Sequence, residues 1–127
     1  MTETKNVKQN ELQSEQLCEV IIESIQDTKG QKIIQLDLRE ISEAPADFFI
    51  ICNGQSDTQV KAISNNLLKT LKKEYGVFPN HVEGQSNSQW ILVDFFDVVV
   101  HVFYPETRAF YDIENLWGDA KVKSFEG

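Results

Sequence analysis

An uninterrupted apolar run in the middle of the chain, Phe48-Phe49-Ile50-Ile51-Cys52, most constrains the fold. Successive side chains of a β-strand point to opposite faces, so a strand formed here presents apolar side chains on both faces. Such a strand is stable only where other elements cover it on each side, as in the centre of a sheet with two covered faces. The run therefore predicts the central strand of a layered fold.

Two segments with helical spacing flank this run in the chain. Apolar residues recur at helical spacing between Leu17 and Ile25, and Gly30 follows where a helix would end. After the central run, Ser56-Asp57-Thr58-Gln59 has the form of a capping box, and the helical pattern behind it continues as far as Gly76. We therefore expect one helix before the central strand and one after it.

Four further segments have the pattern of strands. Residues 33–38 alternate between apolar and polar, and residues 77–84 are expected to contain a short strand flanked by Pro79 and Gly84. Residues 89–94 and 98–103 form a hairpin around Asp94-Phe95-Phe96-Asp97, and residues 107–117 are expected to be helical. This order predicts an α/β (α+β) fold, a mixed sheet of about five strands with helices packed on it.

The length of 127 residues suits one domain whose core needs neither a disulfide nor a metal. We expect a disordered polar tail over residues 1–10, a single domain over residues 11–119 and a flexible C-terminal tail over residues 120–127. The first residues lack the apolar run of a secretory signal, and no segment approaches the roughly 20 apolar residues of a membrane span. The sequence therefore predicts a cytoplasmic protein with no membrane partner.

The chain is acidic, with 20 Asp and Glu against 12 Lys and Arg and a net charge of −8. This charge opposes contact with phosphate backbones, so we expect no direct recognition of nucleic acid and a basic protein as the partner. Acidic residues occupy every fourth position along one face of the first predicted helix: Glu11, Glu15, Glu19, Glu23 and Asp27. The face is either merely solvated or an acidic docking stripe, and the sequence leaves both interpretations open.

The chain has few residues in patterns that favour catalysis or metal binding. Cys18 and Cys52 are far apart in apolar segments and are expected to be reduced core thiols. His81 and His101 lie on different predicted strands, and neither has a second ligand at metal-binding spacing. The sequence therefore predicts no metal site and no cofactor.

Asp94 and Asp97 suggest one alternative activity. Together with Gly54-Gln55-Ser56 as a phosphate-holding turn at a helix N-terminus, they resemble the acidic pair of a magnesium-dependent nucleotidyltransferase. Such enzymes separate the two acids by one residue, so that both side chains point the same way, whereas Phe95 and Phe96 both intervene here. We therefore interpret the aspartates as turn residues that accept bonds from local amides, and we predict no catalytic residue.

The second half of the chain is rich in aromatic residues. Trp90 and Asp94 share one face of their strand, and Val99, His101 and Phe103 share one face of the next. If helices cover only one side of the sheet, one of these sets is exposed, and exposed aromatic side chains favour protein recognition. Core packing is the other interpretation, and the sequence does not decide between them.

The most distinctive motif is Asp97-Val98-Val99-Val100-His101-Val102-Phe103. Other motifs accompany it in a fixed order: Gln59-Val60-Lys61-Ala62-Ile63, Trp90-Ile91-Leu92-Val93-Asp94, Arg108, Phe110-Tyr111 and Leu116-Trp117. Together they resemble the ribosomal silencing factor family, also called the Iojap-like family, from about Leu17 to Trp117.

The resemblance implies a nucleotidyltransferase-like fold that has lost catalysis. It also implies binding to the large ribosomal subunit through large-subunit ribosomal protein fourteen, which would block joining with the small subunit and lower translation under nutrient limitation. A homodimer in the free state is a further implication. Assembly of the large subunit is the alternative role, because it needs the same docking surface.

Five motif positions are expected at the partner interface: Trp90, Asp94, Asp97, His101 and Arg108. Trp90 is expected to act as an apolar anchor, and the two aspartates as acceptors for Lys or Arg of the partner. His101 is expected to make a polar contact with the partner. Arg108 is expected to orient a neighbouring carboxylate such as Glu106 or Asp112.

The chain departs from the family pattern at Phe96, where members usually place glycine or another small residue. A bulky residue resists positive φ, so the departure puts the conformation of the turn in question. Phe96, together with Phe95 and Phe103, is the expected extension of an exposed apolar patch. Three residues near the end are expected to dock the helical tail onto the sheet: Tyr111, Leu116 and Trp117.

Overall fold

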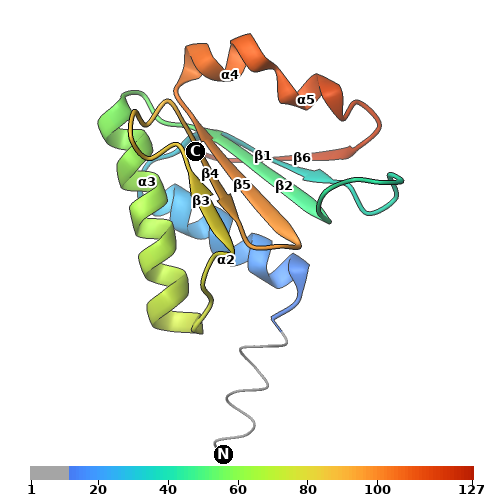
Figure 1. The fold of residues 1–127 in the computed structure, drawn as a ribbon, viewed down its shortest axis with the longest axis horizontal. Coiled ribbons are helices and arrows are strands. Elements are labelled where there is room, and N and C mark those ends of the chain that lie inside the picture. The colour runs from blue at the N-terminus through green and yellow to red at the C-terminus, as the bar shows by residue number, and fades with distance from the viewer. Residues whose placement is uncertain (1–11) are drawn as a thin grey trace, which may run out of the picture.

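The computed structural model describes residues 12–127 and shows helices on both faces of one sheet (Figure 1). The disordered tail predicted for residues 1–10 lies outside the described residues. The elements are α2 (Ser14–Asp27), β1 (Gln31–Asp37), β2 (Phe48–Asn53), α3 (Asp57–Thr70), η1 (Leu71–Tyr75), β3 (His81–Glu83), β4 (Trp90–Asp94), β5 (Val98–Phe103), α4 (Pro105–Tyr111), α5 (Ile113–Leu116) and β6 (Lys121–Phe125). The predicted fold class, a mixed α+β sheet with packed helices, is confirmed.

The sheet has six strands in the order β3-β4-β5-β2-β1-β6. The central pair β2 and β5 is parallel, and every other neighbouring pair is antiparallel. β2 lies in the interior of the sheet, and its first five residues are buried. The prediction that Phe48–Cys52 forms a central strand with both faces covered is therefore confirmed.

Helices α2 and α3 cover one face of the sheet. α2 buries Leu17, Ile21 and Ile25 against this face, and α3 buries Val60, Ile63 and Leu67. At the start of α3, Ser56 Oγ accepts a hydrogen bond from the Gln59 amide at 3.1 Å, which is one half of the predicted capping box. The Gln59 side chain accepts from the Gln55 amide instead of the Ser56 amide. The helix continues through the π-helical turn η1 and ends at Gly76, whose φ of 66° is readily adopted by glycine.

The other face is covered by the short helices α4 and α5. In the antiparallel pairing of β4 with β5, Trp90 lies opposite Phe103, Leu92 opposite His101 and Asp94 opposite Val99. The two aromatic sets that the sequence placed on two strands therefore share this one face. Because α4 and α5 are short, they cover this face only in part, and Trp90 is half-buried.

Strand β6 corrects the sequence prediction at the C-terminal end. Residues 120–127 were expected to be a flexible tail, but Lys121–Phe125 pairs with β1 along its whole length. The Gly127 carbonyl also accepts a hydrogen bond from the Lys32 amide at 3.0 Å. Four of the five residues of β6 are exposed, so the strand is held mainly by backbone hydrogen bonds to β1. Its sequence therefore lacks the hydrophobic pattern that predicts strands in the interior of a sheet. Within residues 12–127, no helix is long and apolar enough to span a membrane.

Candidate functional site

A groove lined by aromatic residues lies where β4 begins and β5 ends, beside helix α4. Its volume is about 600 Å³. We call it the aromatic groove, and its lining residues are Gly84, Asn87, Gln89, Trp90, Tyr104, Glu106, Thr107, Phe110 and Tyr111. Apolar surface with a few polar groups at the rim is typical of protein-recognition sites.

Trp90 forms the link between this groove and the core beneath it. Its ring lies 4.9 Å from that of Tyr111 in the groove and 4.8 Å from that of Phe103 in the core, measured between ring centroids. Its indole Nε1–H donates a hydrogen bond to Nδ1 of His101 at 3.1 Å. Contacts on several sides therefore hold Trp90 in one orientation at the bottom of the groove.

Helix α4 supplies the exposed wall of the groove. None of its residues is buried, and Phe110 has 80% of its side-chain surface exposed. The Phe110 and Tyr111 rings meet edge to face, with centroids 5.0 Å apart. The sequence pattern predicted that Tyr111 docks the helical tail on the sheet, and it indicated no separate role for Phe110 or Tyr104. Helical spacing alone does not distinguish a docking face from an exposed one.

Arg108 holds α4 and α5 to the sheet rather than facing a partner. Its guanidinium donates to both carboxylate oxygens of Glu114, at 3.1 and 2.8 Å. It also donates to the Lys32 carbonyl at 2.7 Å and to Asn53 Oδ1 at 3.0 Å. The expectation that Arg108 orients a carboxylate holds for Glu114 and not for Glu106 or Asp112, and these bonds leave the guanidinium little capacity for an intermolecular contact.

Three expected surface residues are buried. His101 has 4% of its surface exposed, Phe95 has 6% and Phe103 has none. His101 and Phe103 lie under α4 and α5, and Phe95 packs into the opposite face at the hairpin. Their side chains are therefore inaccessible to a partner in this structure, which corrects the expected polar contact of His101 and the expected extension of a surface patch by Phe95 and Phe103.

Asp94 lies at the far end of β4, about 14 Å from Trp90 by strand rise, and Asp97 lies in the turn that follows. Asp94 Oδ1 accepts a hydrogen bond from the Phe96 amide at 2.7 Å, so Asp94 acts as the turn residue predicted. Asp97 is exposed and lies near Arg39 and Asp47 in a second depression. Of the five residues expected at one interface, Trp90 and Arg108 thus lie at one end of the sheet, Asp94 and Asp97 lie at the other, and His101 is buried between them.

Phe96 adopts positive φ, at 73°, despite its bulk. Its side chain points to solvent and is 65% exposed. The turn thus has the left-handed conformation that a glycine would take there, and Phe96 adds an exposed ring beside Asp94 and Asp97 rather than beside Trp90.

The groups needed for the enzymatic alternative are used in other ways. The Gln55 amide of the predicted phosphate turn donates to Gln59 Oε1 at 2.6 Å, and the Gln59 amide in the first turn of α3 donates to Ser56 Oγ, so side chains of the protein already occupy both donors. Among residues 12–127, no group of three or more His, Cys, Asp or Glu could hold a metal ion. Burial raises the pKa of Cys18 and Cys52 to about 12, which keeps both thiols protonated and unreactive.

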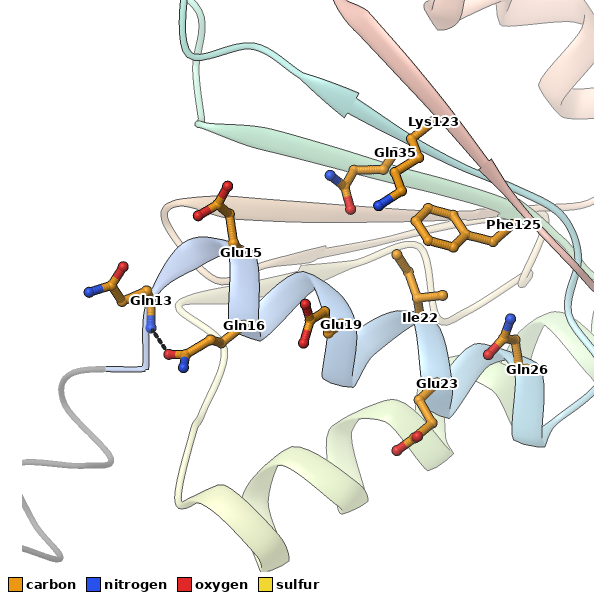
Figure 2. A pocket seen from close by; sticks show the side chains of 10 residues that line it. All are labelled: Gln13, Glu15, Gln16, Glu19, Ile22, Glu23, Gln26, Gln35, Lys123 and Phe125. Atoms are coloured by element: carbon orange, nitrogen blue, oxygen red, sulfur yellow. Dashed lines mark hydrogen bonds between the residues drawn. The ribbon is translucent and has the colours of Figure 1, made fainter.

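A third depression lies between α2 and the edge formed by β1 and β6 (Figure 2). Three acidic residues of the predicted stripe, Glu15, Glu19 and Glu23, line it and are exposed, whereas Glu11 lies outside the described residues. Figure 2 shows Ile22 pointing from α2 toward the ring of Phe125, with Lys123 above. Glu15 also pairs with Arg39 at 3.4 Å.

The fold and the grooves define a small three-layer α+β domain whose aromatic residues are partly exposed on one face of a mixed sheet. The model of the family described as "Ribosomal silencing factor during starvation" matches residues 11–127. The chain belongs to this ribosomal silencing factor family.

Individual relatives agree with this assignment. A ribosomal silencing factor from Halalkalibacterium halodurans is 39% identical over 116 residues, which cover 91% of this chain and 97% of that protein. A crystal structure of a Chromobacterium violaceum protein is 39% identical, covers 91% of this chain and 94% of that one, and has a TM-score of 0.79. A mouse protein named "Mitochondrial assembly of ribosomal large subunit protein 1" is 36% identical over 82 residues, which cover 63% of this chain and 35% of that protein.

Proposed function

We propose that this chain is a non-enzymatic translation inhibitor that acts in the cytoplasm. It binds the large ribosomal subunit through large-subunit ribosomal protein fourteen and sterically blocks joining with the small subunit when nutrients are limited. The observation that carries the proposal is the match to a ribosomal silencing factor family over residues 11–127.

The surface chemistry supports a ribosomal protein, rather than ribosomal RNA, as the binding site on the ribosome. The net charge of −8 disfavours ribosomal RNA and favours a basic ribosomal protein. The aromatic groove supplies Trp90 and Tyr111 as anchors and Phe110 as an exposed neighbour. We place the principal contact there, with Asp94 and Asp97 as acceptors for Lys or Arg at the other end of the sheet, and we propose that a second copy covers the groove in a free homodimer.

Co-sedimentation with isolated large subunits tests this function. The wild-type protein should pellet with large subunits and prevent small subunits from joining them. Truncating the anchor in Trp90→Ala should weaken binding by about 30-fold, as expected for a hot spot worth about 2 kcal/mol. If the wild-type protein stays in the supernatant at micromolar concentration, the proposed function is wrong.

A matched pair of phenylalanines makes the test specific for the groove. Phe110 and Phe78 are both strongly exposed, but only Phe110 lines the aromatic groove. Phe110→Ala should weaken large-subunit binding, whereas Phe78→Ala should leave it unchanged. Equal effects of the two variants would contradict the location that we propose for the interface.

Assembly of the large subunit is a second candidate, favoured by the name of the mouse relative. Both roles use the same docking surface, so binding alone does not separate them. Depletion of the protein from growing cells does: an assembly factor should leave immature large subunits on a sucrose gradient. If the protein is an inhibitor, depleted cells should contain mature large subunits and should fail to reduce translation on starvation.

A further inference from the structure

The imidazole of His101 lies in the interior of the face that α4 and α5 cover. Its ring centroid is 4.6 Å from that of Phe49, edge to face, and 6.2 Å from that of Phe103 in a stacked arrangement. The residue is almost completely buried and lies in the middle of β5, where Leu92 of β4 is its cross-strand partner. A polar ring therefore occupies a position where an apolar side chain would be expected.

The hydrogen bond from Trp90 determines the tautomer of this ring. An indole N–H can only donate, so Nδ1 of His101 must be the acceptor and carries no proton. The proton of the neutral imidazole is then on Nε2, which is buried without a hydrogen-bond partner among the described residues. Burial lowers the pKa of His101 to about 4, so the ring is neutral at neutral pH.

Stability alone does not account for a histidine at this position. A buried N–H without an acceptor is destabilising, and an apolar side chain of similar size would avoid that loss. What histidine provides and an apolar residue does not is an acceptor for the Trp90 indole. His101 Nδ1 meets the Trp90 indole from the core, whereas Tyr111 contacts the same indole in the aromatic groove.

We propose that His101 is a positioning residue, which holds the Trp90 indole in the orientation that the aromatic groove presents to its partner. The partner never touches His101. The hydrogen bond to Nδ1 fixes the rotation of the indole about its own side chain, and the rings of Phe103 and Tyr111 fix its tilt. The binding part of this inference rests on the proposed function, but the orientation of Trp90 does not.

Two substitutions of His101 distinguish the effect of its hydrogen-bond acceptor from the effect of its side-chain volume. His101→Asn places a side-chain oxygen near the position of Nδ1 and keeps an acceptor for the indole. His101→Leu fills the apolar site and removes the acceptor. His101→Leu should be as stable as the wild-type protein or more so in a denaturant titration, so a loss of binding in that variant does not arise from unfolding.

The indole N–H itself reports on its orientation. The chain has two tryptophans, so a spectrum of Trp90→Phe identifies which indole resonance belongs to Trp90. In ¹⁵N-labelled protein, exchange of the Trp90 indole proton with solvent should be at least about 10-fold faster in His101→Leu than in the wild type, as expected for a lost hydrogen bond of about 1.4 kcal/mol. His101→Asn should restore slow exchange to within about threefold of the wild type.

Binding to large subunits completes the test. Affinity should fall about 10-fold in His101→Leu and return close to the wild-type value in His101→Asn. Unchanged indole exchange in His101→Leu overturns the proposal, and so does faster exchange with unchanged affinity. If the wild-type protein binds no large subunits, the proposed function fails, and the indole measurement then decides by itself whether His101 positions Trp90.

Discussion

Phe96 adopts a left-handed backbone conformation that is unfavourable for a residue with a bulky side chain. Its φ of 73° lies in the left-handed region, which costs a residue with a Cβ about 1–2 kcal/mol. The Asp94 carboxylate accepts from the Phe96 amide, and the Phe95 amide donates to the Val98 carbonyl at 2.9 Å, so local hydrogen bonds impose the conformation. The strain at Phe96 is the cost of that tight connection between β4 and β5.

Relief of this strain is measurable. Phe96→Gly should raise the free energy of unfolding by about 0.5–1 kcal/mol, because glycine adopts positive φ freely but loses more chain entropy on folding. A urea titration of both proteins measures the difference. An equal or lower midpoint for the glycine variant would show that the exposed ring contributes contacts that outweigh the strain.

The site residues were predictable only in part. Residue type and strand parity indicate the face of the sheet on which a side chain lies, but not whether helices cover that face. Strand parity placed Trp90 and His101 on sheet faces correctly, and Trp90, the expected anchor, lines the aromatic groove. The sequence predicted no groove. Parity did not reveal that both residues share one face, since that depends on the register of β4 against β5. The burial of His101 and the bonds of Arg108 likewise depend on where α4 and α5 lie.

Among the elements, α3 and β6 are the two extremes of predictability. α3 has a serine N-cap, a regular apolar stripe and a terminating glycine, so every local signal agrees. β6 has exposed Lys121, Val122 and Lys123, and its pairing with β1 depends on backbone groups that all sequences share. The lysines on this edge strand also disfavour its pairing with another sheet.

β6 is expected to protect β1 as well as to extend the sheet. Removal of residues 120–127 would leave the outer backbone groups of β1 unpaired and would also remove the ring of Phe125, which packs against the core cluster on the α2 side of the sheet. We expect the truncated protein to have a lower melting temperature and to aggregate at concentrations where the full chain does not. Thermal melting followed by light scattering measures both effects, and unchanged values would show that β6 has no protective role.

The expected nucleotidyltransferase-like ancestry of the whole fold stays a prediction, whereas the mixed sheet with helices on both faces is established. At this scale the sequence was informative because the central strand, the helices and the hairpin all have strong local patterns. Sheet order was not predictable, since it depends on contacts between segments far apart in the chain.

The pH dependence of stability follows from buried groups across the molecule. The pKa of His101 falls from 6.5 to about 4 on burial, so the unfolded chain binds more protons between these values. Above pH 6.5 the ring is neutral in both the folded and the unfolded chain, and the free energy of unfolding falls as the pH drops from 6.5 toward 4, by about 3 kcal/mol at most. Hydrogen bonding from Arg39 lowers the pKa of Asp37, which adds a further loss below pH 3.8.

The two thiols limit stability at the alkaline end. Burial raises the pKa of Cys18 and Cys52 from 9.0 to about 12, so stability should fall as pH rises above 9. Urea titrations should therefore give a plateau between about pH 6.5 and 9. His101→Asn should flatten the acid side of this profile and leave the alkaline side unchanged, and a wild-type profile that is flat between pH 4.5 and 6.5 would contradict the neutral burial of His101.

The position of β6 at the edge of the sheet has a consequence for biosynthesis. β1 is made early, but the strand that pairs with its outer edge is the last one in the chain order. β1 can pair with β2 through its inner edge as soon as both strands are available, but its outer edge stays unpaired until β6 has been made. Until residues 121–125 are available, the open edge of β1 can pair with other polypeptides, so synthesis of the domain passes through a stage at which it is exposed to aggregation.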